Sequence, residues 1–262
     1  MSLTVVRAFG LCTVQDLGRR GHMHEAVPPG GALVPELLVA ANRAARNADN
    51  APCIEVLGQM VVRANADIAV AGDDGLRELR AGDEIGVASG RRRCTYLAIR
   101  GGVEAPIILD GHGTLLCAEL GRALRAGDVI RATSAPAAKV SRSDPFFDRN
   151  RITIIPGPDH DAFADDALTL LTHAPYRILP TSNRVGTRLA GTALPLVADY
   201  RARSRPMVIG ALEVPPDGQP IVLGPEHPTT GGYPIIGVIA TAELGHFHAV
   251  LLGGQVQFVL GS

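Results

Sequence analysis

The sequence predicts a mainly β protein with a few helices (α+β), built from two β-rich halves. Short runs of apolar and β-branched residues recur along its 262 residues, and turns rich in glycine and proline separate them. This spacing is typical of barrels and sandwiches and not of alternating strand–helix units. A run rich in alanine, serine and proline near the middle of the chain indicates a linker. We therefore expect an N-terminal half over 1–133, a linker over 134–149 and a C-terminal half over 150–262.

The first half is expected to contain strands and one helix. Each predicted strand is an apolar or β-branched run that ends at a turn signal. The strands are predicted over 3–9, 54–63, 67–71, 84–88, 95–100 and 129–133. A helix is predicted over 35–46, because a proline occupies its first position and Asn47 follows as a stop signal.

The second half is expected to follow the same plan. Its strands are predicted over 151–155, 176–179, 184–189, 207–214, 221–223, 235–240, 249–252 and 255–260. A helix is predicted over about 161–172, since Phe163, Ala167 and Leu171 recur at helical spacing.

Composition and charge exclude several classes of function. A formal net charge of −1 gives no electrostatic reason to expect nucleic acid or an acidic membrane as a partner. The N-terminus has no basic segment followed by an apolar run, and no apolar stretch approaches the roughly 20 residues that span a bilayer. The 4 cysteines lie far apart in the sequence, which indicates reduced thiols. We therefore expect a cytoplasmic protein.

The single lysine, Lys139, excludes more chemistry because it lies in the predicted linker. No phosphate-binding G-x-x-x-x-G-K-[ST] loop is present, and a Schiff-base lysine would need a desolvated pocket. A Met-Lys-Met site for covalent biotin is also absent, as is the G-x-S-x-G elbow of serine hydrolases. The pairs His22/His24 and His246/His248 have no third ligand at a recognisable spacing, so no metal site is predicted.

Three clusters contain the candidate site residues. The first is QDLGRRG at 15–21, followed by PPGGAL at 28–33. The second is TSNRVGTRL at 181–189. If it is a strand, Arg184 and Arg188 project from one face, where two guanidinium groups can bracket a carboxylate or phosphate. The alternative is that both are surface arginines paired with acidic residues of a barrel.

The third cluster is the loop EHPTTGGYP at 226–234. A loop that only connects two strands needs about two to five residues. Gly231 and Gly232 permit the backbone to approach a ligand closely, while two hydroxyl groups and a phenol offer hydrogen bonds. The alternative is a rigid corner in which Pro228 and Pro234 only set the direction of the chain.

These blocks, together with AANRAARNADNAPCIEVLG, IPGPDHDAF and ALEVPPDGQPIVLG, carry a resemblance over nearly the whole chain. The sequence resembles the biotin-dependent carboxyltransferase family, whose members are named as the C subunit of 5-oxoprolinase or as allophanate hydrolase subunit 2. The resemblance implies two cyclophilin-like β-barrel halves with a functional cleft between them. It also implies a complex with an A subunit, and with a B subunit that is homologous to this chain.

The family names disagree about activity, and residue chemistry separates them. Allophanate hydrolysis of the amidase type needs a Ser-Ser-Lys triad, which a chain with one linker lysine does not provide. The resemblance best implies a subunit of an ATP-dependent 5-oxoprolinase, a hydrolase that phosphorylates and opens a lactam. It implies that ATP and Mg²⁺ are shared with partner subunits and that this chain carries no covalent biotin. Two alternatives stay open. One is a carboxyltransferase that acts on a urea-like amide with carboxybiotin, and the other is a non-catalytic regulatory partner of a kinase-inhibitor-like B subunit.

In this interpretation the loop 226–234 forms one wall of the cleft and meets 183–188. Arg184 and Arg188 neutralise an anion held by a backbone nest at the two glycines, and His227 or Glu226 handles protons. The remaining candidates bind the substrate or nucleotide: Gln15, Asp16, Arg19, Gly30, Gly31, Asn183, Thr229, Thr230, Gly231, Gly232 and Tyr233.

The chain also departs from the family pattern, and the segment 115–121 looks shortened. Val34 stands where an Asp N-cap is common, Glu213 where Gln is common, and Glu226 where Asp is common. Glu213 therefore adds a negative charge near the expected cleft.

Overall fold

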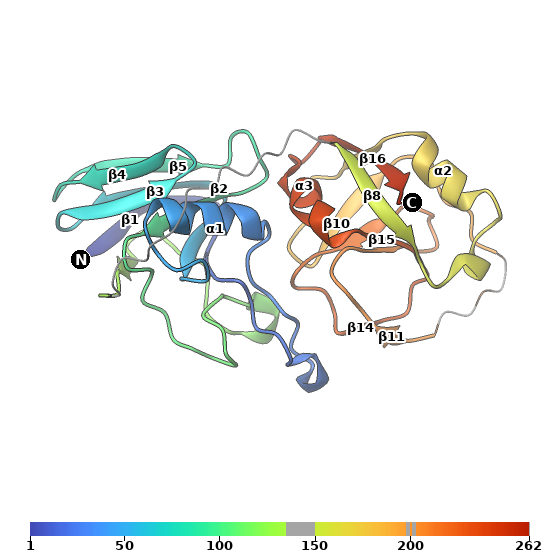
Figure 1. Cartoon of the computed structure of the whole chain (residues 1–262), viewed down its shortest axis with the longest axis horizontal. Coiled ribbons are helices and arrows are strands. Elements are labelled where there is room, and N and C mark those ends of the chain that lie inside the picture. The colour runs from blue at the N-terminus through green and yellow to red at the C-terminus, as the bar shows by residue number, and fades with distance from the viewer. Residues whose placement is uncertain (135–149, 198–199, 201–202, 262) are drawn as a thin grey trace. The chain divides into compact units, whose positions relative to one another are not determined.

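The computed structural model describes residues 1–134, 150–197, 200 and 203–261. They form two compact units: the first contains 1–21 and 29–134, and the second contains 22–28 and the described residues from 150 onward (Figure 1). Apart from Ser134, the predicted linker lies outside the described residues, so the domain borders stay a prediction. The mainly β fold is confirmed, and three α-helices accompany the strands of the described residues.

The first unit is a seven-stranded sheet in the order β4-β3-β6-β2-β1-β7, with β5 paired to β2. Its strands are β1 (Ser2–Gln15), β2 (Cys53–Ala64), β3 (Ile68–Gly72), β4 (Gly75–Leu79), β5 (Glu84–Ala88), β6 (Thr95–Ile99) and β7 (Val129–Arg131). One edge of β2 is shared, because its first part pairs with β6 and its second part with β5. No pairing between described residues closes this sheet into a barrel.

Strand β1 is longer than predicted because a glycine does not end it. Gly10 lies opposite Gly58 in the β1–β2 ladder, and both have a positive φ, of 83° and 131°. A Cβ on either glycine would overlap a carbonyl oxygen of the facing strand. The two strands therefore approach each other closely at this point and stay paired on both sides of it. Strand β4 was not predicted, since its short GLREL sequence contains two charged residues and most of it is exposed.

Helix α1 (Pro35–Ala44) begins at the predicted proline, and Val34 gives it no side-chain cap. Buried side chains of the sheet bind the backbone here instead. The Glu55 carboxylate accepts a hydrogen bond from Leu33 N at 2.7 Å, and the Tyr96 hydroxyl accepts one from Val34 N at 3.1 Å. Tyr96 in turn donates to Glu55 at 2.6 Å. This pair binds the N–H groups of Leu33 and Val34 just before the helix, whereas an Asp N-cap would accept from N–H groups of its first turn.

The second unit contains the predicted closed barrel, in the order β10-β13-β12-β15-β8-β16-β9. Its strands are β8 (Arg151–Pro156), β9 (Tyr176–Ile178), β10 (Gly186–Ala190), β12 (Ala211–Glu213), β13 (Ile221–Leu223), β15 (Ile235–Ile239) and β16 (Gln255–Leu260). A short ribbon of β11 (Arg205–Pro206) and β14 (Thr230–Gly231) accompanies the barrel. The barrel core includes Leu189, Leu212, Val222, Phe247 and Phe258.

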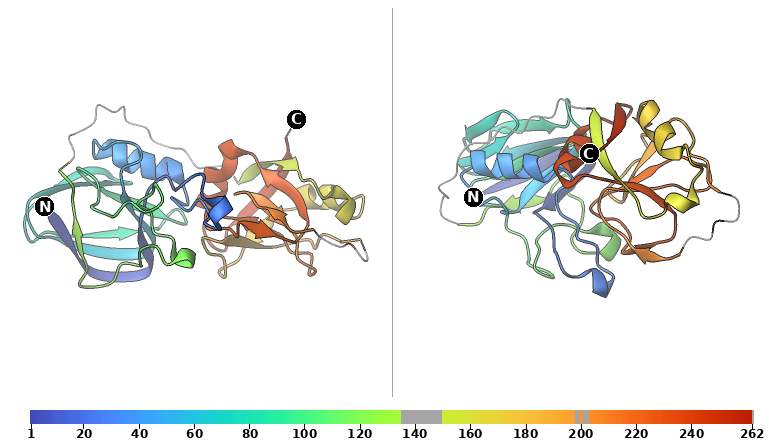
Figure 2. Two further views of the ribbon diagram at one scale, coloured as in Figure 1. Left: turned by 90° about the horizontal axis from the view of Figure 1, so that it is seen from below. Right: turned by 45° about the vertical axis from the view of Figure 1, so that its right-hand side comes forward.

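Two predictions in this unit were wrong. The segment 249–252 is not a strand, because Ala249 ends helix α3 (Leu244–Ala249) and a turn follows. This helix buries three successive residues, Phe247, His248 and Ala249, which a half-buried strand would place on alternating faces. The helix predicted over 161–172 is interrupted, since a 3-10 turn (His160–Ala162) precedes the shorter α2 (Ala167–His173). Figure 2 shows helices α2 and α3 on the outside of the barrel. No helix of the described residues is long and apolar enough to cross a membrane.

Candidate functional site

The first predicted cluster lies at the end of β1, where the side chains of Gln15, Asp16 and Arg19 are buried. Gln15 Nε2 donates to Thr13 Oγ1 and to the Thr114 carbonyl, both at 3.0 Å. The two oxygens of Asp16 accept from Gly18 N at 2.9 Å and from His112 N at 2.6 Å. These side chains therefore bind the backbone of their own unit, which is a structural role.

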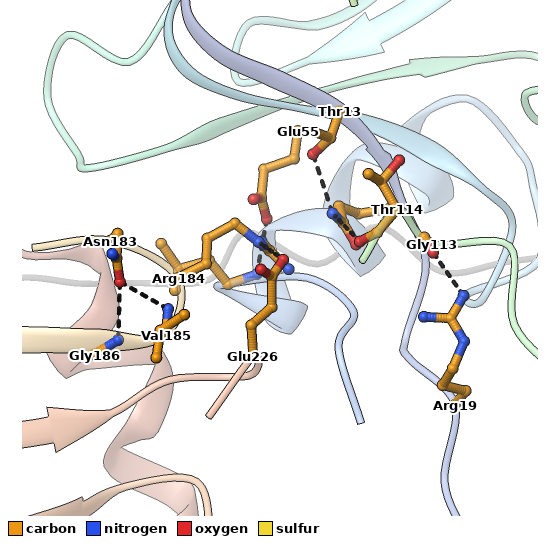
Figure 3. A network of polar contacts seen from close by, with 12 residues as sticks. Thr13, Arg19, Glu55, Gly113, Thr114, Asn183, Arg184, Val185, Gly186 and Glu226 are labelled. Carbon is orange, nitrogen blue, oxygen red and sulfur yellow. Dashed lines mark hydrogen bonds and ion pairs between the residues drawn. The ribbon is translucent and has the colours of Figure 1, made fainter. Parts of the chain in front are cut away.

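Arg19 and the glycines near it have the same role. Arg19 Nη2 donates to the Gly113 carbonyl at 2.6 Å (Figure 3). Gly30 and Gly31 have positive φ values, and a Cβ on Gly31 would lie 2.6 Å from the Gly18 nitrogen. The cluster therefore ties the end of β1 to two neighbouring loops. A binding role for Gln15, Asp16, Arg19, Gly30 and Gly31 stays a prediction.

The second and third clusters meet inside the second unit. Arg184 Nε donates to Glu226 Oε1 at 2.6 Å, and Glu226 N donates to the Arg184 carbonyl at 3.1 Å (Figure 3). Asn183 Oδ1 accepts from the backbone of Val185 and Gly186, at 2.9 and 3.1 Å, and so fixes the turn before β10. The predicted contact between the loop 226–234 and the segment 183–188 is present. A cleft between the two halves stays a prediction.

The predicted bracket of two arginines is wrong. Strand β10 begins only at Gly186, after the Asn183 turn, so Arg184 and Arg188 do not share a face of one strand. Arg184 is buried and paired with Glu226, which matches the alternative interpretation of an arginine paired with an acidic residue. Arg188 is exposed, and among the described residues its side chain has no ion-pair or hydrogen-bond partner.

The predicted anion nest at Gly231 and Gly232 is also wrong. Such a nest needs a residue with positive φ, and neither glycine has one. Gly231 lies in β14 instead, paired with Arg205 of β11. A Cβ on Gly231 would overlap Met207 and would lie 2.7 Å from Glu213 Oε1. The glycine therefore serves close packing against the barrel.

His227 is buried at the start of this loop, and Nδ1 lies 2.7 Å from the Pro228 carbonyl. This geometry places a proton on Nδ1. Burial lowers the pKa of His227, which favours the neutral imidazole. Further along the loop Tyr233 is exposed, as is Thr230, and Thr229 is half-buried. The roles predicted for these side chains stay predictions.

Two buried carboxyl groups near the loop were not among the predicted site residues. Asp159 accepts hydrogen bonds from Arg205 Nη2 at 2.5 Å, Tyr200 Oη at 3.0 Å and Ile235 N at 2.9 Å. It therefore anchors both ends of the β11–β14 region. The sequence signal that could have identified Asp159 is its place in the block IPGPDHDAF. Glu213 lies at the end of β12, where burial raises its pKa.

Among the described residues no metal centre forms at the predicted positions, and one sizeable cavity lies elsewhere. The described residues contain no group of three or more His, Cys, Asp or Glu side chains that could hold a metal ion. A cavity of about 410 Å³ lies in the first unit, lined by parts of β3, β4, β5 and β6 together with Arg91 and Arg92. None of the predicted site residues lines this cavity.

Comparisons with known proteins give the family. The model of the carboxyltransferase domain, subdomain A and B, matches residues 25–260. The chain is 32% identical to the C subunit of 5-oxoprolinase from Escherichia coli (strain K12), over 98% of this chain and 90% of that one. It is also 25% identical to the urea amidolyase of Lachancea kluyveri, over 94% of this chain but 16% of that protein.

The fold agrees with this sequence similarity. The crystal structure of the K. lactis urea amidolyase superimposes with a TM-score of 0.88 at 23% identity, over 100% of this chain and 19% of that one. The resemblance found in the sequence motifs is thereby confirmed. This chain belongs to the family of the carboxyltransferase domain, subdomain A and B.

Proposed function

We propose that this chain is the C subunit of an ATP-dependent 5-oxoprolinase complex. It is active only together with an A subunit and a homologous B subunit. The observation that carries the proposal is the similarity to the C subunit of 5-oxoprolinase from E. coli, because it covers nearly the whole of both chains. A second relative with the same name, from Haemophilus influenzae, is 30% identical over 94% of this chain. The reaction opens the lactam of 5-oxoproline to give glutamate.

ATP would supply the phosphoryl group that activates the lactam oxygen. The described residues offer it neither a backbone nest at Gly231 and Gly232 nor a group of three metal-ligating side chains. The described residues therefore show no ready-made Mg²⁺–ATP site at the loop 226–234. We place the ligands of the nucleotide on the partner subunits and assign to this chain the binding of the lactam.

Carboxyl transfer to a urea-like amide is the second candidate, because the chain also resembles urea amidolyases over 94% of its length. The two candidates differ in what they consume. A 5-oxoprolinase complex needs ATP and 5-oxoproline, whereas a carboxyltransferase needs carboxybiotin from a separate carrier.

Co-expression with homologues of the A and B subunits tests the proposal. We expect ATP hydrolysis that depends on 5-oxoproline, formation of glutamate, and little or no activity of the isolated chain. Avidin, which sequesters biotin, should leave this activity unchanged. Robust turnover by the isolated chain, or activity with urea that avidin abolishes, would refute the proposal.

A further inference from the structure

Glu213 differs from the other buried carboxyl groups of the described residues. The buried carboxyl groups of the described residues are Asp16, Glu55, Asp159, Glu213 and Glu226. The other four accept hydrogen bonds from backbone N–H groups, hydroxyl groups or arginines. Glu213 is only 8% exposed and has no hydrogen-bond or ion-pair partner among the described residues. Burying an unpartnered polar group is costly, and such groups are concentrated at functional sites.

The side chain of Glu213 lies on the outer face of the barrel. Residues alternate along β12, so that Leu212 enters the barrel core while Ala211 joins a small outer cluster with Met207 and Ile235. Glu213 shares the side of Ala211, and its Oε1 reaches the ribbon at Gly231. The carboxyl group therefore lies at the border between the barrel face and the C-terminal part of the loop 226–234.

Strand register places Arg188 on the same face. In the barrel, Ile221 of β13 lies opposite Arg188 of β10 on one side and opposite Glu213 of β12 on the other. Residues directly opposite each other in a sheet point to the same side, and each strand spacing is about 4.8 Å. The backbones of Arg188 and Glu213 thus lie about 10 Å apart, with the half-buried Ile221 between them. Among the described residues, neither the exposed guanidinium group nor the buried carboxyl group has a partner.

These groups match one class of small molecule. A neutral carboxyl group presents an O–H donor and a C=O acceptor side by side. The amide of a small ring is held cis, so its N–H and C=O also lie side by side and can form two hydrogen bonds with that carboxyl group. Open-chain secondary amides are almost always trans, and their N–H and C=O point in opposite directions. The burial of Glu213, which raises its pKa, favours the neutral form.

We propose that the barrel face Arg188–Ile221–Glu213 binds a small cyclic amide that carries a carboxylate, with Glu213 on the cis-amide edge and Arg188 on the carboxylate. Ile221 contributes an apolar floor for the ring, and Gly186 leaves that floor uncovered, because a Cβ there would lie 2.8 Å from Ile221 Cγ2. The inference rests on the proposed function and names the site and substrate class that go with it.

Binding measured by calorimetry tests the site without requiring turnover. The full chain, alone and with its B subunit homologue, is titrated with 5-oxoproline, with 2-pyrrolidinone, which lacks the carboxylate, and with N-acetylglycine, whose amide is trans. We expect 5-oxoproline to bind most tightly, and each of the other two to lose about 10- to 100-fold in affinity.

Variants then assign each end of the ligand. Arg188→Ala should weaken 5-oxoproline by a similar factor and leave 2-pyrrolidinone unchanged, whereas Glu213→Ala should weaken both. Glu213→Gln should keep binding, because a carboxamide also presents a donor beside an acceptor. Arg177→Ala is the matched control, since Arg177 is an exposed arginine on the adjacent strand β9.

The outcomes separate the site from the proposed function. Equal binding of 5-oxoproline by the wild type, Arg188→Ala and Glu213→Ala overturns the site, even if the complex turns over 5-oxoproline. Binding that follows the expected order without any ATP-dependent turnover by the full complex supports the site and overturns the proposed function. Failure of 5-oxoproline to bind the chain, whether or not the B subunit is present, overturns the site as well.

Discussion

Removing the carboxylate of Glu226 should destabilise the second unit strongly. The side chains of Arg184 and Glu226 are only 3% and 7% exposed, and Nε and Oε1 lie 2.6 Å apart. Glu226→Ala would leave the Arg184 guanidinium group buried without this counter-charge. Breaking a buried pair in this way costs about 3–5 kcal/mol of unfolding free energy.

The exposed pair Arg63–Glu84 gives a matched control in the first unit. Its nitrogen and oxygen are 2.7 Å apart, nearly as close as in the buried pair, but the side chains are 51% and 43% exposed. Solvent screens such a pair, which contributes only about 0.2–1 kcal/mol. Geometry is therefore similar in the two pairs, and burial is what differs.

Urea denaturation of Glu226→Ala and Glu84→Ala measures both costs. The transition must be followed with a probe in each unit, because two units need not unfold together. The double variant Arg184→Met/Glu226→Leu should recover most of the loss, since it removes both buried charges. A loss below about 1 kcal/mol for Glu226→Ala would show that burial does not set the strength of this contact.

Three further predictions concern single residues in both units. Burial lowers the pKa of His227, so the unfolded state binds more protons than the folded state as pH falls below the ordinary value of 6.5. The unfolding free energy should therefore fall as pH decreases through that value, and it should fall less in His227→Gln. Thermal melts at several pH values measure this difference. Gly58→Ala should cost about 1–3 kcal/mol in urea titrations, because an L residue is strained at φ 131° and its Cβ would overlap the Phe9 carbonyl. Tyr96→Phe should cost about 1–3 kcal/mol and increase amide exchange at Val34, because the hydroxyl serves both Glu55 and Val34 N; unchanged exchange there would contradict this role.

Much of the fold could be predicted because apolar runs and turn residues are local signals. Strands β5, β13 and β16 have the predicted bounds, and α1 begins at the predicted proline. The failures came from tertiary effects. Gly10 looked like the end of a strand because its partner Gly58 is distant in sequence. The run 249–252 looked like a strand because a single sequence does not show that Phe247 belongs to a helix packed on the core.

The candidate site was harder to predict because residue type does not reveal pairing. Arg184 and Arg188 have the same chemistry and a regular spacing, yet one is buried with Glu226 and the other is exposed. The Asn183 turn, which shifts the start of β10, decides between them. Glu213 was noted only as a departure from the family pattern, and its importance depends on strand register, which brings together residues 188, 221 and 213.

The loop 226–234 contributes differently at its two ends. At its start, Glu226 and His227 are buried and bind groups of the same unit, so substitutions there should change stability first. Towards its end, Tyr233 is exposed, so its substitution should change ligand binding first. The two original interpretations of this loop, rigid corner and binding wall, therefore need not compete, because each fits a different part of it. Stability and binding measured on the same set of variants would separate those parts, and a Tyr233→Phe variant that lost stability but kept full affinity would contradict this division.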